Sequence, residues 1–407
     1  MSRRFLFLQG VCSPFFRCLG AGLREHGHEV CKINFNGGDA LAWRGGGATS
    51  YRGRIEDLPA FYAHYVQQHA ISDVVLFGDQ RPVHRAMTAQ ARALGVRVHV
   101  YEEGYFRPHW ITLERDGVNA HSGLPRDPRW YLETARRLPH VPHGNPLSQP
   151  FRVRAWHDVL YHLGSAVNPL LYPHYRTHAV HAVTEYWHYI KRGLQLPGHA
   201  RRDREQVARL FASRTPYFLL PLQLGSDAQI RQHSRFESML QVLDHVLVSF
   251  AQAAPGRYTL VIKNHPLDPG LNDYAAHVRE ACRLYGLQGR VLYLETGNTP
   301  DLLKHARGVV TVNSTVGASA LLHRRATKTL GAAIYDMPGL TFQGPLDAFW
   351  HNPGRPNNKL FRAFRDVVIH GTQVDGGFYT RAGIERAVRN SIKPLTDTLS
   401  PLQALKR

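Results

Sequence analysis

The chain has 407 residues, 43% hydrophobic and 20% charged, and this length predicts two domains rather than a single core. Lysine and arginine total 50 against 31 aspartate and glutamate, a formal net charge of +19, so the expected partners are nucleic acid, an acidic membrane face or an anionic small substrate. No apolar run approaches the ~20 residues of a membrane span, and the N-terminal apolar run is too short for a signal peptide, so we expect a cytoplasmic protein.

The first 125 residues alternate short apolar runs with helix-like segments, and glycines stand at the turns. This alternation predicts a parallel α/β sheet. The stretch Arg44-Gly45-Gly46-Gly47 is interpreted either as a flexible lid or as a plain surface linker. The expected strands are 5–9, 29–35, 74–78 and 96–101, and the expected helices are 15–26 and 83–94.

Residues 126–205 differ from the rest because they are rich in His, Tyr, Trp, Arg and Pro and contain no clear strand. We expect helices at 151–163 and 178–192 within this segment. The α/β alternation then resumes, with a joint between the two domains near 201–214. The strands expected after the joint are 217–222, 258–263, 291–294, 309–312 and 327–331, with a long helix at 236–254 and a shorter one at 316–323.

These patterns predict an N-terminal α/β domain at 1–205 that includes the helical segment, a C-terminal α/β domain at 206–385, and a terminal tail or helix at 386–407. Ligands of open α/β sheets bind outside the carboxyl ends of the strands, so the residues there are candidates for a site. Asp, Asn, Gly and Pro also occur at strand ends for conformational reasons. Five polar groups nevertheless follow predicted strands, at 78–82, 102–108, 223–227, 264–266 and 313–315.

Two of these groups are suited to a phosphate. Asn313-Ser314-Thr315 leads from a strand into a helix, whose first N–H groups and nearby hydroxyls can bind a phosphate or be used for capping alone. Pro266 fixes the chain direction after His265, and the imidazole of His265 can donate to a phosphate as charge develops on it or serve as a structural turn residue.

The other groups supply carboxylates. Asp227 lies in a loop after a strand, where it can attack an electrophilic carbon or cap a helix beginning near Ala228. Glu102 and Glu103 are adjacent, and repulsion between two carboxylates raises the pKa of one of them, which suits a general acid or base. Arg107 can neutralise one carboxylate or hold a substrate carboxylate. The alternative is a surface turn with a salt bridge.

Taken in this order, the motifs resemble the retaining β-Kdo transferases of Gram-negative capsule biosynthesis, in particular the smaller enzymes that add the first Kdo to a phosphatidylglycerol-type lipid. The resemblance extends from Phe5 to Trp350. One departure is His109, where the family often has an acidic residue after Arg-Pro. The matching stretches are FLQGVCSPFF, NFNGGD, FGDQRPVH, EEGYFRPHWITLE, PLQLGSDAQI, KNHPLDPG, NSTVGASAL and IYDMPGLTFQGPLDAFW.

The resemblance implies a GT-B-like fold, with two Rossmann-type domains, a cleft between them and CMP-β-Kdo as donor. It makes Asp227 the nucleophile of a double displacement and either Glu102 or Glu103 the acid/base, with Glu103 preferred because it directly precedes Gly104. His265 would contact the donor phosphate. The other residues assigned on this basis are Lys263, Pro266, Gln223, Asn313, Ser314 and Thr315 for the donor, Arg81 and Arg107 for the substrate carboxylate or phosphate, and Gly10, Asn36, Gly37 and Asp39 on the acceptor side.

The resemblance also implies an anionic glycerophospholipid acceptor, a peripheral position on the cytoplasmic face of the inner membrane and contacts with other capsule-assembly proteins. No metal or other cofactor is expected, and the four cysteines form no CxxC pair and are predicted to be free thiols. The basic, aromatic segment 126–205 would contact the membrane, or would be an ordinary helical subdomain. The alternatives are a transferase for another CMP-sugar, a nucleotide-sugar epimerase and, more remotely, a nucleic-acid-binding protein.

Overall fold

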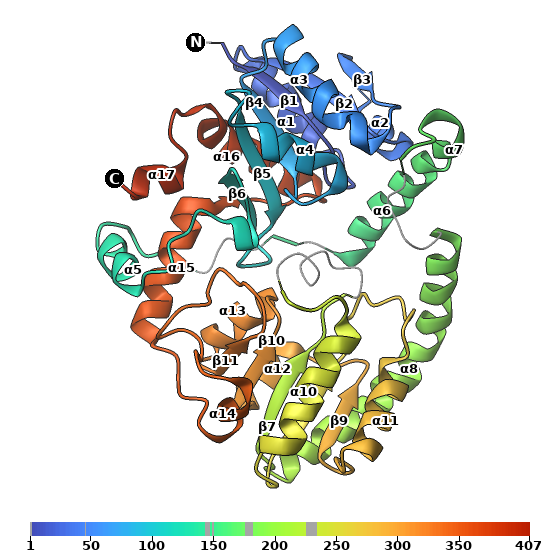
Figure 1. Cartoon of the computed structure of the whole chain (residues 1–407), viewed down its shortest axis with the longest axis vertical. Helices are drawn as coiled ribbons and strands as arrows, with labels where there is room; N and C mark the ends of the chain where they lie inside the picture. Colours follow the sequence, from blue (N-terminus) through green and yellow to red (C-terminus); the bar gives the residue numbers. More distant parts are fainter. Residues whose placement is uncertain (1, 45, 143–146, 149, 176–181, 225–233) are drawn as a thin grey trace. The chain divides into compact units, whose positions relative to one another are not determined.

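A computed structural model describes residues 2–44, 46–142, 147–148, 150–175, 182–224 and 234–407. The chain divides into two compact units, each built around its own sheet (Figure 1). Unit 1 contains residues 1–125, 134–179 and 365–407, and unit 2 contains 126–133 and 180–364. The predicted α/β class is confirmed, because both sheets are largely or wholly parallel and are covered by helices.

The sheet of unit 1 has seven strands in the order β12-β6-β5-β4-β1-β2-β3. The five strands from β3 to β5 are parallel and follow the Rossmann order, while β6 and β12 add an antiparallel edge. The strands are β1 (Arg4–Phe7), β2 (Glu29–Asn34), β3 (Ala48–Ser50), β4 (Asp73–Phe77), β5 (Arg97–Glu103), β6 (Trp110–Arg115) and β12 (Gln373–Asp375).

Helices cover both faces of this sheet because alternate strand residues are apolar on each face. Phe5, Phe7 and Val75 pack against residues of α1 and α16, whereas Leu6, Val74 and Leu76 pack against residues of α3 and α4. The helices that belong wholly to unit 1 are α1 (Phe15–Glu25), α2 (Gly37–Trp43), α3 (Leu58–Gln68), α4 (Pro82–Gln90), α6 (Phe151–Ser165), α7 (Asn168–Leu171), α16 (Arg381–Thr396) and α17 (Pro401–Leu405).

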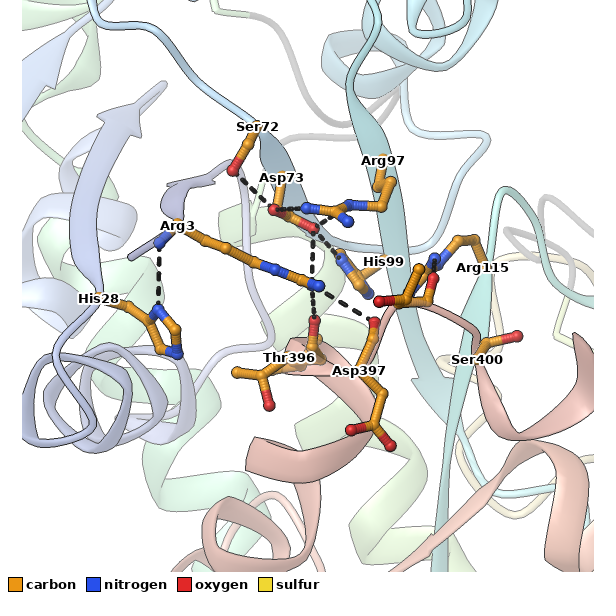
Figure 2. Close-up of polar contacts among 12 residues, drawn as sticks. Arg3, His28, Ser72, Asp73, Arg97, His99, Arg115, Thr396, Asp397 and Ser400 are labelled. Carbon is orange, nitrogen blue, oxygen red and sulfur yellow. Dashed lines mark hydrogen bonds and ion pairs between the residues drawn. The ribbon is translucent and has the colours of Figure 1, made fainter. Parts of the chain in front are cut away.

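A buried charge cluster ties the C-terminal part of the chain to the start of the unit 1 sheet (Figure 2). Asp73 lies at the beginning of β4 and accepts hydrogen bonds from Arg97 on both of its oxygens, at 2.8 Å on Oδ1 and 2.7 Å on Oδ2, and His99 Nε2 lies 2.8 Å from Oδ1. Arg3 lies 3.8 Å from Asp73 and donates to the Leu395 carbonyl at 3.0 Å. The cluster therefore holds the end of α16 beside β1 and β4.

Burial alone would raise the pKa of Asp73, but its hydrogen bonds with His99, Arg97 and Ser72 outweigh burial and lower the pKa to about 2. The carboxylate is therefore ionised at neutral pH. It lies at the opposite end of the strands from the polar groups that follow them, so its role is structural.

The sheet of unit 2 has five parallel strands in the order β11-β10-β7-β8-β9, which is again the Rossmann order. Phe218 and Leu220 pack with residues of α10 and α14 on one face, and Tyr217 and Leu219 pack with α12 and the end of α8 on the other. The strands are β7 (Tyr217–Pro221), β8 (Thr259–Lys263), β9 (Val291–Leu294), β10 (Gly308–Thr311) and β11 (Ala326–Thr329). The helices are α8 (Ala182–Ala212), α10 (Met239–Ala253), α11 (Tyr274–Leu284), α12 (Thr299–His305), α13 (Thr315–Leu322) and α14 (Leu346–His351).

The division into units differs from the predicted domain boundaries. The expected joint at 201–214 coincides with the end of α8, a continuous helix that runs through Pro197 and belongs to unit 2. Residues 365–407 return to unit 1, so they are neither part of a C-terminal domain nor a separate tail. Two helices cross the divisions, α5 (Pro128–Ala135) and α15 (Asn358–Thr372). The described part of the segment 126–205 contains helices and no strand, as predicted, but 134–179 belong to unit 1 and the rest of the segment belongs to unit 2.

Candidate active site

In each sheet, described residues of the predicted strand-end groups lie at the switch point, where the strand order reverses, or after the strand beside it. In unit 1 this point lies between β1 and β4, and the residues after these strands meet there. Arg81, which follows β4, donates to Gln9 Oε1 at 3.1 Å and to the Gly10 carbonyl at 2.8 Å. Its guanidinium also lies over the Phe77 ring, 5.0 Å from the centroid. Arg81 and Gly10 are thus brought together as neighbours.

Glu102 lies at the end of β5, next to this switch point. Its carboxylate accepts a hydrogen bond from the Glu103 backbone N–H at 2.9 Å. Burial, and then the negative charge of Glu103, raise the pKa of Glu102 to about 7, although the charges of Arg81 and Arg107 act in the opposite direction. A carboxyl group that exchanges its proton near neutral pH is suited to general acid–base work.

Glu103 has different surroundings, because alternate residues of a strand point to opposite faces. Its carboxylate forms an ion pair with Arg154 of α6 at 3.2 Å and lies 3.4 Å from the Tyr379 hydroxyl. Arg107 donates to the Gly104 carbonyl at 3.3 Å. Glu103 is therefore paired with Arg154 and not, as one of the two expectations for Arg107 had it, with Arg107.

Three residues predicted on the acceptor side, Asn36, Gly37 and Asp39, lie at the start of α2 and have structural contacts there. Asn36 Oδ1 accepts from Asp39 N–H at 2.7 Å, and Asp39 accepts from the Tyr161 hydroxyl of α6 at 2.9 Å. A Cβ atom added to Gly37 would lie 2.0 Å from the Gly164 carbonyl oxygen, so the backbones of α2 and α6 are in direct contact there. These residues hold α6 against α2 within unit 1. Their role on the acceptor side stays a prediction.

The switch point of unit 2 lies between β7 and β10, and it brings together Gln223 and Asn313. Gln223 Nε2 donates to Asn313 Oδ1 at 3.0 Å, and the Asn313 backbone N–H donates to Gln223 Oε1 at 3.1 Å. Ser314 caps α13 by accepting from the Val316 N–H at 3.2 Å, and Tyr335 donates to the Ser314 carbonyl at 2.6 Å. The helix start is therefore held rigidly, and a helix start favours anions through its N–H groups and dipole.

His265 follows β8, the strand adjacent to β7, and its imidazole is oriented by the loop around it. The Leu267 N–H donates to His265 Nδ1 at 3.1 Å, so Nδ1 is an acceptor and the proton of the neutral ring is on Nε2. Nε2–H is then the group that can donate to an anion. Asn264 supports the loop by accepting from the His265 N–H at 2.7 Å and donating to Asp268 at 3.1 Å.

Arg192 of α8 also supports this loop. Its guanidinium donates to the Asp268 carbonyl and, at 3.3 Å, to the His265 carbonyl, and it lies 3.4 Å from the Glu295 carboxylate. Glu295 in turn accepts from Asn264 at 2.9 Å. Lys263 donates to the Asn264 carbonyl at 3.1 Å, and burial lowers its pKa.

Sequence reasoning missed several residues of these two clusters. Glu295 follows β9, so the rule that selected the other strand ends would have found it. Arg192, Arg154 and Tyr161 lie within helices, where no local signal separates them from other polar helix residues. Asp227, the predicted nucleophile, lies outside the described residues.

No group of three or more His, Cys, Asp and Glu side chains placed to hold a metal occurs in the described part of the chain. None of the described helices has the length and apolarity that a membrane crossing requires. The expected absence of a cofactor stays a prediction.

The model of the family described as capsule polysaccharide biosynthesis protein matches residues 72–379, and the chain belongs to this family. Among its relatives, the capsule polysaccharide export protein KpsS of Escherichia coli is 36% identical over 93% of this chain and 97% of its own length. The capsule polysaccharide modification protein LipB of Neisseria meningitidis serogroup B is also 36% identical, over 93% of this chain and 92% of its own length.

Among solved structures, the β-Kdo 2,7 transferase of Thermosulfurimonas dismutans KpsC is similar over 96% of this chain and 99% of its own, at 14% identity and a TM-score of 0.44. A glycosyltransferase from Rickettsia africae is similar over 100% of this chain and 96% of its own, at 10% identity and a TM-score of 0.34. The assignment to the family rests on the sequence relatives, not on these distant likenesses.

Proposed function

We propose that this member of the capsule family is a retaining glycosyltransferase that moves Kdo from CMP-β-Kdo to an anionic glycerophospholipid and so begins a poly-Kdo linker. The proposal rests on family membership, on the resemblance of its motifs to β-Kdo transferases, and on one structural observation. That observation is the position of strand-end polar groups at or beside the switch point of each Rossmann-type sheet, with a titratable carboxyl in unit 1 and anion donors in unit 2.

In the proposed first step, an Asp227 oxygen attacks the anomeric carbon of the donor and the bond from that carbon to the phosphate oxygen of CMP breaks. The departing phosphate carries the electron pair, and His265 Nε2–H together with the start of α13 stabilises it. A phosphate monoester is a good leaving group, so protonation by a strong acid is not required.

In the second step, a hydroxyl of the acceptor attacks the glycosyl–Asp227 ester and the Asp227 carboxylate leaves. The two inversions give net retention. The acceptor hydroxyl gives its proton to a carboxylate as it attacks. We assign this base to Glu102, because its raised pKa suits proton transfer, whereas Glu103 forms an ion pair with Arg154.

The test is to incubate the protein with CMP-Kdo and a short-chain phosphatidylglycerol and to look by mass spectrometry for Kdo added to the lipid. His265→Ala should abolish transfer while the circular dichroism of the fold is unchanged. A panel of donors in which CMP-sialic acid or a UDP-sugar is consumed and CMP-Kdo is not would replace this proposal with one of the alternative sugar-nucleotide enzymes.

The covalent step has its own test. Glu102→Gln should slow the second step, so a Kdo adduct on the peptide containing Asp227 should accumulate when the variant is incubated with CMP-Kdo. Transfer to lipid by the wild-type protein without any adduct in the slowed variant would contradict the double displacement but not the activity.

A further inference from the structure

Two neighbouring helices of unit 1, α6 and α7, leave an unusual number of large apolar side chains in contact with solvent. Trp156 is 62% exposed, Leu163 is 64% exposed and Leu170 is 84% exposed. Val159 is also exposed, and the spacing of three or four residues puts Trp156, Val159 and Leu163 on one face of α6. Val167, which is partly exposed, precedes α7, and Leu170 lies on that helix. A contiguous apolar face of this kind on a folded unit marks an interaction surface.

The opposite side of α6 packs closely against α2 of the same unit, so the apolar face is not exposed because the helix is loosely packed. Gly164 and Gly37 bring the backbones of α6 and α2 together, Gly37 N–H donates to Asn168 at 2.8 Å, and the Asn36 side chain donates to the Tyr161 hydroxyl at 2.8 Å. Figure 1 shows α6 and α7 at the margin of the unit 1 sheet, beyond α2. The helix therefore presents its apolar face from a fixed position.

A basic pocket of about 170 Å³ lies beside this face, between α6, α2 and the start of α1. Leu160 and His157 of α6 form one wall, and Arg17 of α1 and Arg44 at the end of α2 form others. Both arginines are exposed, and no Asp or Glu is among the described residues that line the pocket. Leu160 is one helical turn from Trp156 and from Leu163, so the basic pocket and the apolar face adjoin.

We propose that the apolar face of α6 and α7 and the Arg17–Arg44 pocket together dock unit 1 on a bilayer containing anionic phospholipid. An apolar helix face bearing Trp suits the boundary between headgroups and acyl chains, and two arginines beside it suit a lipid phosphate. The acidic residue of α6, Asp158, has its carboxylate 3.8 Å from His162 Nε2. A neutral or cationic partner would leave the two arginines without a counter-charge, which is why we choose the anionic bilayer.

The same helix connects this surface to the candidate catalytic carboxylates. Arg154, on the side of α6 that faces unit 1, forms the ion pair with Glu103. Docking through α6 would therefore bring a membrane acceptor to the part of unit 1 that carries the glutamates. This inference rests on the proposed function for the identity of the acceptor, but the docking surface itself can be tested without any sugar donor.

The experiment is co-sedimentation of the full chain with vesicles of phosphatidylglycerol and phosphatidylcholine, or of phosphatidylcholine alone. A juxtamembrane arginine contributes ~1 kcal/mol, or about fivefold in affinity, so Arg17→Gln with Arg44→Asn should weaken binding to the anionic vesicles by about 25-fold. Leu163→Ser with Leu170→Ser should weaken binding to at least the same extent. The matched controls are Arg389→Gln and Leu284→Ser, which replace exposed residues of α16 and α11 and should bind as the wild type does.

Transfer to a short-chain, water-soluble acceptor separates this inference from the proposed function. The docking variants should keep that activity and lose activity on vesicle-bound acceptor. Vesicle binding that is unchanged in both double variants would overturn the proposal. Full competition of vesicle binding by inorganic phosphate at millimolar concentration would also overturn it, since the pocket would then bind a free anion. A wild-type dimer that dissociates when Leu163 and Leu170 are replaced would overturn it as well, since the apolar face would then bind a second copy of the chain.

Discussion

The raised pKa of Glu102 makes Glu102→Gln a test of stability as well as of activity. The unfolded pKa of 4.5 and the folded value of about 7 mean that between these pH values the folded protein keeps a proton that the unfolded chain has released. Stability is therefore lost as the pH rises through this window. The difference of about 2.5 between the two pKa values corresponds to about 3 kcal/mol, and the free energy of unfolding of the wild type is lower by this amount at pH 8 than at pH 4.5. Glutamine has no charge to bury, so the variant should be more stable by up to that amount.

The assay is urea unfolding at pH 8 and at pH 4.5, combined with hydrogen exchange of the β5 amides so that unit 1 is followed separately. Glu102→Gln should gain about 3 kcal/mol at pH 8 and little at pH 4.5, while its transfer activity falls about 10²- to 10⁴-fold. The control is Glu103→Gln, which removes the partner of Arg154 and should give no gain. A Glu102→Gln variant that is equally stabilised at both pH values, or destabilised at pH 8, would refute the reasoning.

The other predictions concern residues whose contacts lie within a single unit. Arg192→Met should weaken CMP binding, measured by calorimetry, about 10- to 100-fold, because charged hydrogen bonds to the His265 loop are lost, and Arg192→Lys should recover part of the affinity. The control is Arg201→Met, at a residue whose side chain is 84% exposed, and equal CMP affinity of Arg192→Met and this control would contradict the prediction. Asp73→Asn should lower the free energy of unfolding by about 2 kcal/mol at pH 7, because the lowered pKa of Asp73 stabilises the wild type above pH 3.8 and this contribution is lost as the pH falls toward 2. An equal loss of stability at pH 2.5 would argue against the ion cluster. Gly37→Ala should lower the melting temperature by several degrees through collision with the Gly164 carbonyl, whereas Gly46→Ala, which meets no atom within 4 Å, should not.

Most parallel strands were predictable because each is a short, continuous apolar run between turn residues. Strands of this type are buried on both faces, as β4 and β7 are, and so have a strong local signal. The antiparallel strand β6 is not among the predicted strands, although its residues lie in the matched stretch EEGYFRPHWITLE, and the unpredicted strands β3 and β12 have only three residues each. The return of 365–407 to unit 1 depends on contacts between distant residues, such as Arg3 with the Leu395 carbonyl, which no local pattern reveals.

The site was predictable where strand ends alone determine it. The Gln223–Asn313 pair and the approach of Arg81 to Gly10 follow from parallel strands that end at one edge. The choice between Glu102 and Glu103 did not follow, because it depends on which carboxyl is buried and which one meets Arg154. Of the aromatic residues expected at a membrane, Trp156 is exposed, but the Tyr161 and Tyr175 hydroxyls are bonded to Asp39 and Gln9 inside unit 1. Residue type alone could not distinguish these environments.

The late return of the chain to unit 1 has a consequence for the order of events during translation. The five strands of unit 2 have all been synthesised once residue 329 has left the ribosome, whereas Phe5, Phe7 and Phe15 must wait for Ile384 and Leu395 to cover them. Unit 2 can therefore fold while the face of the unit 1 sheet that α16 covers is still exposed to solvent. Nascent chains in which residue 364 has just left the ribosome should resist protease in unit 2 and be cut in unit 1, although unit 1 begins at the N-terminus.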